Sequence, residues 1–244
     1  MINTSDKKSE NLNNILFPHE ILKNYDQSKY PFPQILQDLF GLNKLDQLHE
    51  KIYSEEIFNR DLGKDSASKF HSIFYSEIKK KDSKLRTTWE SFLTNEVKNH
   101  FSYADSLIVQ KLPSIRIHIP NGLAIKRWHC DSDEDHKHPL GELNCILALT
   151  DMHDTNSLWR ESKPNQADFK PFDLKTGELV YWNGNTCIHG NKINSTEQTR
   201  MSLDFRVFPR KEYEKHISNS LGKENSTATM GTRFIIGEYY KEVF

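Results

Sequence analysis

Apolar side chains recur at helical spacing in the first half of the chain, between about residues 34 and 105. Three such runs are present: Ile35, Leu39, Leu42 and Leu45, then Phe70, Ile73, Phe74 and Ile78, then Leu85, Trp89, Phe92, Leu93 and Val97. Because side chains three and four positions apart share one face of an α-helix, these runs predict three amphipathic helices. Ser83 or Asp82 is expected to cap the third helix with a side-chain oxygen.

After about residue 105 the pattern changes to short apolar or alternating runs separated by turn residues, which is typical of β-strands. We expect strands at 114–119, 126–131, 142–149, 156–161, 168–174, 178–182, 186–189 and 199–208. So many short strands in one stretch predict an α+β protein built on a double-stranded β-helix, the jelly-roll architecture of cupin-like proteins. The N-terminal helices are expected to pack on its outer face.

The length of 244 residues favours a single enlarged domain with a substantial core. Residues 1–33 are polar and proline-containing, and we interpret them as an N-terminal extension. The domain is then expected to cover 34–244. Within it we distinguish a helical part at 34–105, a β-helix core at 106–210 and a polar C-terminal tail at 211–244 whose last apolar residues dock back on the body.

The charge balance favours a small-molecule partner. The 33 Lys and Arg against 34 Asp and Glu give a net charge of -1, so no overall field attracts nucleic acid or an anionic membrane. The N-terminus lacks the apolar core of a signal peptide, and no stretch approaches the roughly 18 apolar residues of a membrane span. Cys130, Cys145 and Cys187 lie far apart without a CxxC pair. A cytoplasmic protein is the simplest expectation.

The most informative motif is His129-Cys130-Asp131 followed much later by His189. In a strand, positions i and i+2 point to the same face, so an H-x-D there directs an imidazole and a carboxylate to one point. A histidine from a distant strand completes a set of two histidines and one carboxylate, which leaves metal positions open and favours iron(II). His136 and His138 lie close by, but a polar loop at the mouth of the site explains them better than further metal ligands.

Arg200 and Ser202 follow His189 and share one face of the strand at 199–208. A guanidinium can hold the distal carboxylate of a chelating 2-oxo dicarboxylate through two charge-assisted hydrogen bonds, and a neighbouring hydroxyl can add one more. Met201, Leu203, Phe205 and Val207 have the opposite parity, which turns an apolar row toward the helices. A surface ion pair is the alternative explanation for Arg200.

Further polar residues have parities or positions that bring them toward the predicted interior. Asn144 is expected to contact the cofactor, and the candidate substrate contacts are Arg116, His118, Asp133, Trp159, Glu161, Asp204 and Arg206. Buried charges require partners, so a structural ion pair or a position at a strand edge is the alternative for Arg116 and His118. A place in the core is the alternative for Trp159. An inner face of this kind suits a zwitterion or a polyol.

The chain resembles the iron(II)- and 2-oxoglutarate-dependent oxygenases, in particular members of the streptomycin-biosynthesis type. The resemblance runs from about Pro113 to Pro209 and rests on SIRIHIP, the H-x-D motif, GELN with LTD, TNSLW-x-ES, HGNKIN and TRMSLDFRV. Together these segments are specific. Singly, only the combination of H-x-D, the distal histidine and R-x-S is.

The resemblance implies iron(II) held by His129, Asp131 and His189, with 2-oxoglutarate bound to the iron and clamped by Arg200 and Ser202. It also implies that dioxygen converts 2-oxoglutarate to succinate and carbon dioxide while an unactivated C–H bond of a small polar metabolite, such as a free amino acid or part of an antibiotic, is hydroxylated. Related halogenases replace the carboxylate ligand with a small residue, so the presence of Asp131 favours hydroxylation. Desaturation and ring chemistry stay open.

Two other functions remain as alternatives. A cupin-like metalloenzyme that does not use 2-oxoglutarate shares the β-helix and a histidine-rich site, although Arg200 with Ser202 argues against it. A non-catalytic jelly-roll binding module is the other, and it predicts indifference to chelators.

Overall fold

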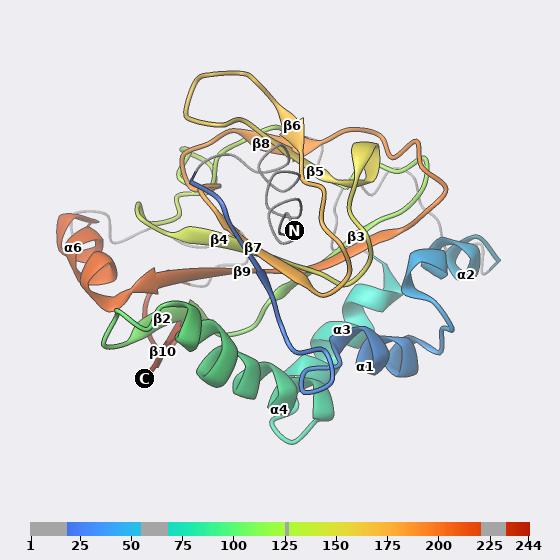
Figure 1. The fold of residues 1–244 in the computed structure, drawn as a ribbon, viewed down its shortest axis with the longest axis horizontal. Helices are drawn as coiled ribbons and strands as arrows, with labels where there is room; N and C mark the ends of the chain where they lie inside the picture. Colours follow the sequence, from blue (N-terminus) through green and yellow to red (C-terminus); the bar gives the residue numbers. More distant parts are fainter. Residues whose placement is uncertain (1–18, 55–67, 125–126, 221–232) are drawn as a thin grey trace, which may run out of the picture.

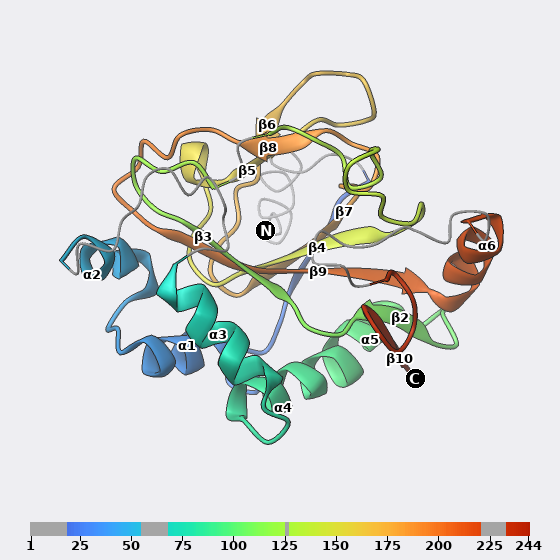
Figure 2. The same ribbon diagram turned by 180° about the vertical axis from the view of Figure 1, so that it is seen from behind.

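The computed structural model describes residues 19–54, 68–124, 127–220 and 233–244. In Figure 1 a large antiparallel sheet runs through the middle of the molecule, with a small sheet on one side and the N-terminal helices on the other. The reverse view in Figure 2 shows the same three layers. The chain is therefore a mixed α and β protein with antiparallel sheets, as the sequence predicts at this level.

Each of the three apolar runs contains a helix, but the first helix ends at Phe40, so Leu42 and Leu45 of the first run lie outside it. The helices are α1 (Phe32–Phe40), α3 (Lys69–Lys79) and α4 (Lys84–Ser91), and α4 continues through a π-helical segment (Phe92–Val97) into α5 (Lys98–His100). Ser83 caps α4, since its hydroxyl accepts a hydrogen bond from the Arg86 backbone N–H at 3.1 Å. The predicted cap is confirmed. Short 3-10 segments at Leu45–Gln47 and Asp154–Asn156, and the helices α2 (Leu48–Ser54) and α6 (Arg210–Ser220), were not predicted.

The large sheet has the strand order β1-β7-β4-β9-β2-β10, and β3 also pairs with β9. The bounds are β1 (Ile21–Asn24), β2 (Leu107–Gln110), β3 (Ser114–His118), β4 (Leu143–Ala148), β7 (Glu178–Trp182), β9 (Arg200–Pro209) and β10 (Tyr240–Val243). The small sheet has the order β6-β5-β8, with β5 (Leu158–Arg160), β6 (Lys170–Pro171) and β8 (His189–Asn191).

Strand β9 lies in the middle of the large sheet, and its side chains alternate between the two faces. Met201, Leu203, Phe205 and Val207 are fully buried in the core that the N-terminal helices share. Phe205, for example, packs edge to face on Trp89 of α4 with ring centroids 5.1 Å apart. The predicted apolar row of this strand is confirmed, and the other face of β9 is turned toward the small sheet.

Three strand predictions are corrected. Residue 126 lies outside the described residues, and 127–131 form no continuous strand; only His129 makes a bridge, to His189. Strand β8 begins at His189, where the strand expected at 186–189 would end, and the strand expected at 168–174 is reduced to Lys170–Pro171. These segments are short, and their pairing depends on tertiary contacts that local alternation does not reveal.

Both ends of the described chain join the large sheet. Strand β1 lies within the expected N-terminal extension and pairs with β7, so ordered structure begins earlier than the sequence predicts. Strand β10 pairs with β2, which agrees with a C-terminal end that docks back on the body. Residues 1–18, 55–67 and 221–232 lie outside the described residues.

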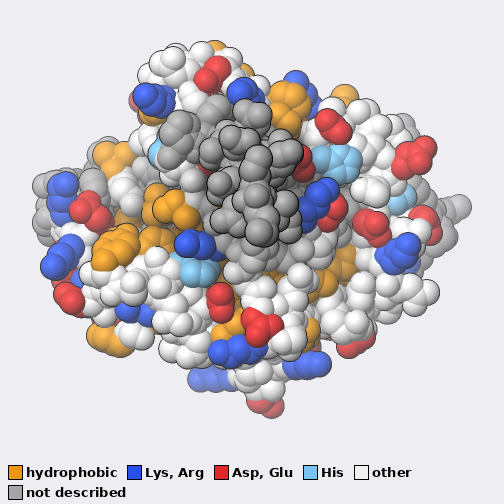
Figure 3. Space-filling view, viewed as in Figure 1, with side chains coloured by type: hydrophobic (Ala, Val, Ile, Leu, Met, Phe, Trp, Pro, Cys, Tyr) orange, Lys and Arg blue, Asp and Glu red, His pale blue; other side chains and the backbone are white. Residues whose placement is uncertain are grey.

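Two surface properties bear on possible partners. None of the helices in the described part of the chain has the length and apolar character needed to cross a membrane. Figure 3 shows acidic and basic side chains interspersed over the described part of one face, without a broad area of either sign. This pattern agrees with the near-neutral net charge of -1.

Candidate metal centre

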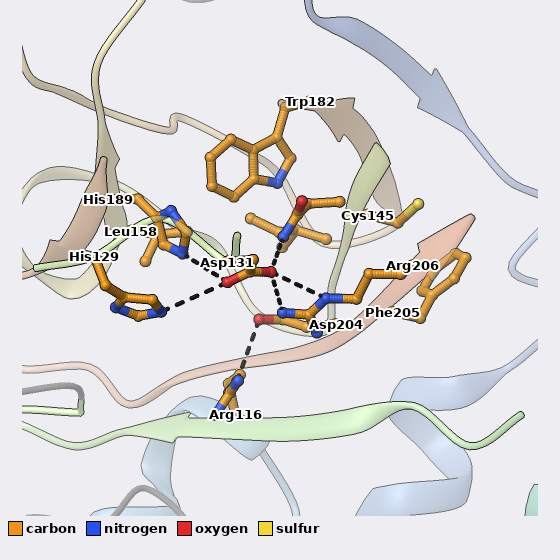
Figure 4. Close-up of a pocket in the computed structure, with 12 residues that line it drawn as sticks. Arg116, His129, Asp131, Cys145, Leu158, Trp182, His189, Asp204, Phe205 and Arg206 are labelled. Atoms are coloured by element: carbon orange, nitrogen blue, oxygen red, sulfur yellow. Dashed lines mark hydrogen bonds and ion pairs between the residues drawn. The ribbon is translucent and has the colours of Figure 1, made fainter. Parts of the chain in front are cut away.

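Three predicted metal ligands converge between the two sheets. The Nε2 atoms of His129 and His189 each lie 3.6 Å from Oδ1 of Asp131, and the three ligand atoms are all within 4.8 Å of one another. Backbone pairing brings His129 and His189 together. The distance from the His129 nitrogen to the His189 carbonyl oxygen is 3.0 Å, and the distance from the His189 nitrogen to the His129 carbonyl oxygen is 2.8 Å. In Figure 4 both imidazoles approach Asp131 from the same side.

Backbone carbonyls orient the two imidazoles. Nδ1 of His129 lies 3.0 Å from the Arg127 carbonyl oxygen, and Nδ1 of His189 lies 3.0 Å from the Cys187 carbonyl oxygen. Because a carbonyl only accepts, Nδ1 must carry the proton and donate, which leaves the Nε2 lone pair directed at Asp131. Burial lowers the pKa of His189 to about 4, so this ring is neutral at pH 7 and able to bind a cation.

The other oxygen of Asp131 is fixed on the opposite side. Oδ2 accepts hydrogen bonds from Asn144 Nδ2 at 2.7 Å and from Arg206 Nη2 and Nε at 2.6 and 3.2 Å. Burial raises the pKa of this carboxyl, but the Arg206 guanidinium holds it well below its usual value of 3.8. Asp131 is therefore ionised, with Oδ1 left to face the two imidazoles.

The loop after Asp131 supports this arrangement. The backbone N–H of His138 donates to the Asp131 carbonyl oxygen at 2.9 Å, and the His138 ring bonds to buried Glu142, which also accepts from the hydroxyl of Tyr240 on β10. His136 stacks on His129 with ring centroids 4.0 Å apart. Asp131, His138 and Glu142 also lie close enough to form a second candidate cluster, but its side chains already bond to one another and to neighbouring groups.

A cavity opens beside the three ligands, with an empty volume of about 350 Å³ that includes its mouth. Its polar lining residues are Arg116, His129, Asp131, Asn144, Trp182, His189, Asp204 and Arg206. Arg116 and Asp204 face each other, with Nε and Oδ2 3.4 Å apart. Figure 4 shows Trp182 on one side of Asp131 and the Arg116–Asp204 pair on the other. The cavity thus combines a candidate metal position with charged and hydrogen-bonding groups.

Arg200 and Ser202 lie on the interior row of β9 but are not among the residues that line this cavity. Both are buried. Arg200 donates to the Asn156 carbonyl oxygen at 3.2 Å and to Ser202 Oγ at 3.3 Å, and Ser202 donates to Asp204 at 2.7 Å. A surface position for Arg200 is excluded, and its contact with 2-oxoglutarate stays a prediction.

The other predicted substrate contacts divide into two groups. Arg116, Asp204 and Arg206 line the cavity. The other four are outside its lining, and each already has polar partners: His118 with the Asn156 and Gly122 carbonyl oxygens, Asp133 with His136, Trp159 with the Asp154 carbonyl oxygen, and Glu161 with the Asn165, Ala167 and Ile188 backbone N–H groups. Contact of these four residues with a substrate stays a prediction.

Two features of the site were missed by sequence reasoning. Trp182 lines the cavity, and its ring packs edge to face on His189 with centroids 5.0 Å apart. Arg206 and Asn144 donate hydrogen bonds to Asp131, a predicted metal ligand, in addition to facing the cavity. The alternation of β7 and β9 gives the interior parity of Trp182 and Arg206, but it does not show which group each one meets.

Comparison with known proteins adds one relative in sequence. The chain is similar to the streptomycin biosynthesis protein StrG of Streptomyces griseus. The two are 29% identical over 219 residues, which cover 90% of this chain and 96% of StrG. No protein-family model matches the chain.

Several solved structures are similar at a lower level. CytC3 with Fe(II) and alpha-ketoglutarate is 16% identical, with a TM-score of 0.44 and coverage of 79% of this chain and 74% of CytC3. AviO1 from Streptomyces viridochromogenes Tue57 is 11% identical, with a TM-score of 0.43 and coverage of 86% and 97%. Similarity of this degree leaves the activity of the present chain to be argued from its own residues.

Proposed function

We propose that this protein is an iron(II)- and 2-oxoglutarate-dependent oxygenase that hydroxylates an unactivated C–H bond of a small polar metabolite. The observation that carries the proposal is the convergence of His129 Nε2, His189 Nε2 and Asp131 Oδ1 on one point beside a cavity. Two imidazoles and one carboxylate, with open positions left for co-substrates, form the ligand set of non-haem iron(II) oxygenases.

The residues present fit such an iron. The carbonyl partners of His129 and His189 leave both Nε2 atoms free to bind, and Asn144 with Arg206 orients the carboxylate of Asp131. Fixed partners of this kind raise metal affinity because the ligands need not reorganise on binding. When bound, iron(II) with 2-oxoglutarate activates dioxygen, so that substrate, 2-oxoglutarate and dioxygen give hydroxylated product, succinate and carbon dioxide.

The protein's own part is to bind, orient and exclude water. Arg200 and Ser202, on the interior row of β9, are the predicted partners of the distal carboxylate of 2-oxoglutarate. The presence of Asp131 as a ligand favours hydroxylation over halogenation.

The strand order supports a double-stranded β-helix. Segments alternate between the sheets along the chain: β3 in the large one, His129 beside the small one, β4 in the large one, β5 and β6 in the small one, then β7, β8 and β9. The resulting sets are β3-β9-β4-β7 and His129-β8-β5-β6. Two facing four-membered antiparallel layers of this kind are the pattern of a jelly roll.

The substrate class is inferred from the cavity and from the relative. Arg116, Asp204 and Arg206 make the wall of the cavity charged, which suits a polar molecule better than an apolar one. StrG is named for the biosynthesis of streptomycin, and similarity over most of both chains supports a role in the modification of a small metabolite.

The test is iron-dependent consumption of 2-oxoglutarate. Purified protein is incubated with iron(II), dioxygen and isotopically labelled 2-oxoglutarate, with amino acids and polyols as trial substrates, and labelled succinate is measured by mass spectrometry. We expect labelled succinate to form only when iron(II) is present, and its formation to be lost in Asp131→Ala. Metal binding without any consumption of 2-oxoglutarate would favour the cupin-like alternative, and indifference to metal and chelator would favour a binding module.

A further inference from the structure

Three side chains form a row across the interior face of the large sheet, directly beside the candidate metal centre. The strand register pairs Trp182 of β7 with Asn144 of β4, and Asn144 with Arg206 of β9. Directly opposite residues have Cβ atoms only about 5 Å apart, so neighbours in the row are within reach of the same small ligand group. All three residues line the cavity.

Two polar atoms in this row have no hydrogen-bond partner among the described residues. They are Nε1 of Trp182 and Oδ1 of Asn144, in side chains that are 2% and 5% exposed. Buried polar atoms of native proteins nearly always have a partner, because an unsatisfied one costs about 1–3 kcal/mol. In Figure 4 the indole nitrogen of Trp182 is on the side of the ring that faces Asp131. These atoms therefore point to a missing partner inside the cavity.

The orientation of the Asn144 amide follows from chemistry. Its other terminal atom lies 2.7 Å from Asp131 Oδ2, and an ionised carboxylate only accepts, so that atom must be the NH₂ group. The Asn144 atom without a hydrogen-bond partner is therefore the amide oxygen Oδ1. The row consequently presents one donor, the Trp182 N–H, beside one acceptor, the Asn144 oxygen.

Gly184 lies so close to Trp182 and Asn144 that only a residue without a side chain fits at this position. A Cβ at position 184 would lie 2.6 Å from the Trp182 ring and 2.7 Å from the Asn144 amide, so no side chain fits there. The Gly184 carbonyl also accepts from the Asp131 backbone N–H at 3.0 Å. The glycine thus keeps Trp182 and Asn144 next to the metal ligand without filling the space that they face.

We infer that Trp182 and Asn144 form a binding subsite for a hydroxyl group of a polyol substrate, in place of the cofactor contact predicted for Asn144 from the sequence. This inference rests on the proposed oxygenase function. A hydroxyl accepts from the indole N–H and donates to the amide oxygen at the same time, which satisfies both atoms. A carboxylate accepts only and would leave Asn144 unpaired beside the Asp131 carboxylate. An ammonium donates only and would leave Trp182 unpaired. The subsite therefore selects a neutral, hydroxyl-bearing ligand over an amino acid or a dicarboxylate.

The test follows the indole N–H resonance of Trp182 by nuclear magnetic resonance in protein labelled with nitrogen-15. The diamagnetic zinc-loaded protein is titrated with glycerol, myo-inositol and glucose as polyol probes, and with alanine and glutarate as a zwitterion and a dicarboxylate. Trp182→Phe assigns the resonance and removes the N–H donor together with part of the buried ring, while it keeps an aromatic side chain at this position. Trp89→Phe is the matched control, because the Trp89 N–H bonds to the Lys111 carbonyl oxygen and the residue lies outside the cavity lining.

We expect at least one polyol to shift the Trp182 resonance saturably, while alanine and glutarate do not. The affinity of that polyol should fall about tenfold in Trp182→Phe, the value of one hydrogen bond of about 1.4 kcal/mol, and stay unchanged in Trp89→Phe. A resonance that no polyol moves would mean that an ordered water alone satisfies the pair, and this overturns the inference. A shift by glutarate, or unchanged polyol affinity in Trp182→Phe, overturns it as well.

The outcome is separable from that of the oxygenase proposal. Consumption of 2-oxoglutarate is measured on the same wild-type preparation with iron(II). Polyol-dependent shifts without any 2-oxoglutarate consumption would refute the oxygenase and keep the hydroxyl subsite. Consumption without polyol-dependent shifts would refute the subsite alone.

Discussion

Arg206 is predicted to stabilise the metal-free protein by neutralising Asp131. Two Arg206 nitrogens lie 2.6 and 3.2 Å from Asp131 Oδ2, and both side chains are less than one-tenth exposed. Arg206→Met keeps most of the aliphatic volume but leaves a buried carboxylate with Asn144 as its remaining side-chain donor. Breaking a buried ion pair in this way costs about 3–5 kcal/mol, so we expect a loss of this size in the free energy of unfolding at pH 7.

The loss should shrink as the pH falls. In the wild type the pKa of Asp131 is below the usual 3.8, so its stabilising contribution is fully present above that value and is lost only as the pH falls through the lower folded pKa. Without Arg206 the main lowering influence is gone, and burial moves the pKa of Asp131 upward. Protonation of the Asp131 carboxyl then removes the unpaired buried charge from the variant. The difference in free energy of unfolding between the wild type and Arg206→Met therefore decreases between pH 7 and about pH 4.

The assay is urea unfolding with a chelator present, followed by tryptophan fluorescence at pH 7 and pH 5. Arg210→Met is the matched control, because Arg210 pairs with Glu214 and Glu242 at a partly exposed position. Its free energy of unfolding should stay close to that of the wild type. An Arg206→Met protein as stable as the wild type at pH 7, or a deficit that does not narrow on acidification, would refute the reasoning.

Three further substitutions test the fold. Ser83→Ala removes the cap of α4 and should cost about 1 kcal/mol in urea unfolding, whereas no change would show that the cap is unimportant. Phe205→Ala leaves a cavity in the core against Trp89 and should cost about 3–5 kcal/mol; a loss below about 1 kcal/mol would contradict the packing. Tyr240→Phe removes a donor to buried Glu142 and should cost about 1–3 kcal/mol, seen as a lower thermal midpoint; an unchanged midpoint would argue against this bond.

Strong periodicity made much of the β core predictable. Strands β3, β4, β7 and β9 lie where the sequence predicts them within one or two residues, because apolar alternation over five or more positions is hard to satisfy in another way. The alternation of β9 also gives the two faces correctly, with Met201 and Leu203 in the core. The convergence of His129, Asp131 and His189 follows from the motif as well.

Strand β2 (Leu107–Gln110) was missed although it is mostly apolar and fully buried, whereas the other missed elements carry weak local signals. Strand β10 reads Tyr-Lys-Glu-Val and helix α6 is mostly polar, so their positions depend on β2 and on the end of β9. The segment around Asp131 was expected as a strand but turns directly after the aspartate, with backbone N–H groups bonded to Gly184 and Asn185. Such a path is decided by the partner segment, which local alternation does not specify.

Within the site, the type of a residue and its parity in a strand indicate which face its side chain lies on. They do not indicate which group that side chain contacts. Arg206 was expected to face the interior, and it does, yet its bond to Asp131 depends on where the loop after His129 runs. Trp182 was expected only as part of an apolar strand, since an aromatic residue at such a position is more often core than cavity wall. Its unpaired N–H becomes visible only with the three-dimensional arrangement.

The most direct test of the account is anaerobic addition of iron(II) and then 2-oxoglutarate to the purified protein, followed by visible absorption spectroscopy. We predict a saturable charge-transfer band that requires both additions, is absent in Asp131→Ala and needs more 2-oxoglutarate in Arg200→Ala. A folded wild-type protein that binds iron(II) but gives no band with 2-oxoglutarate, or an Asp131→Ala protein with the wild-type spectrum, would contradict it.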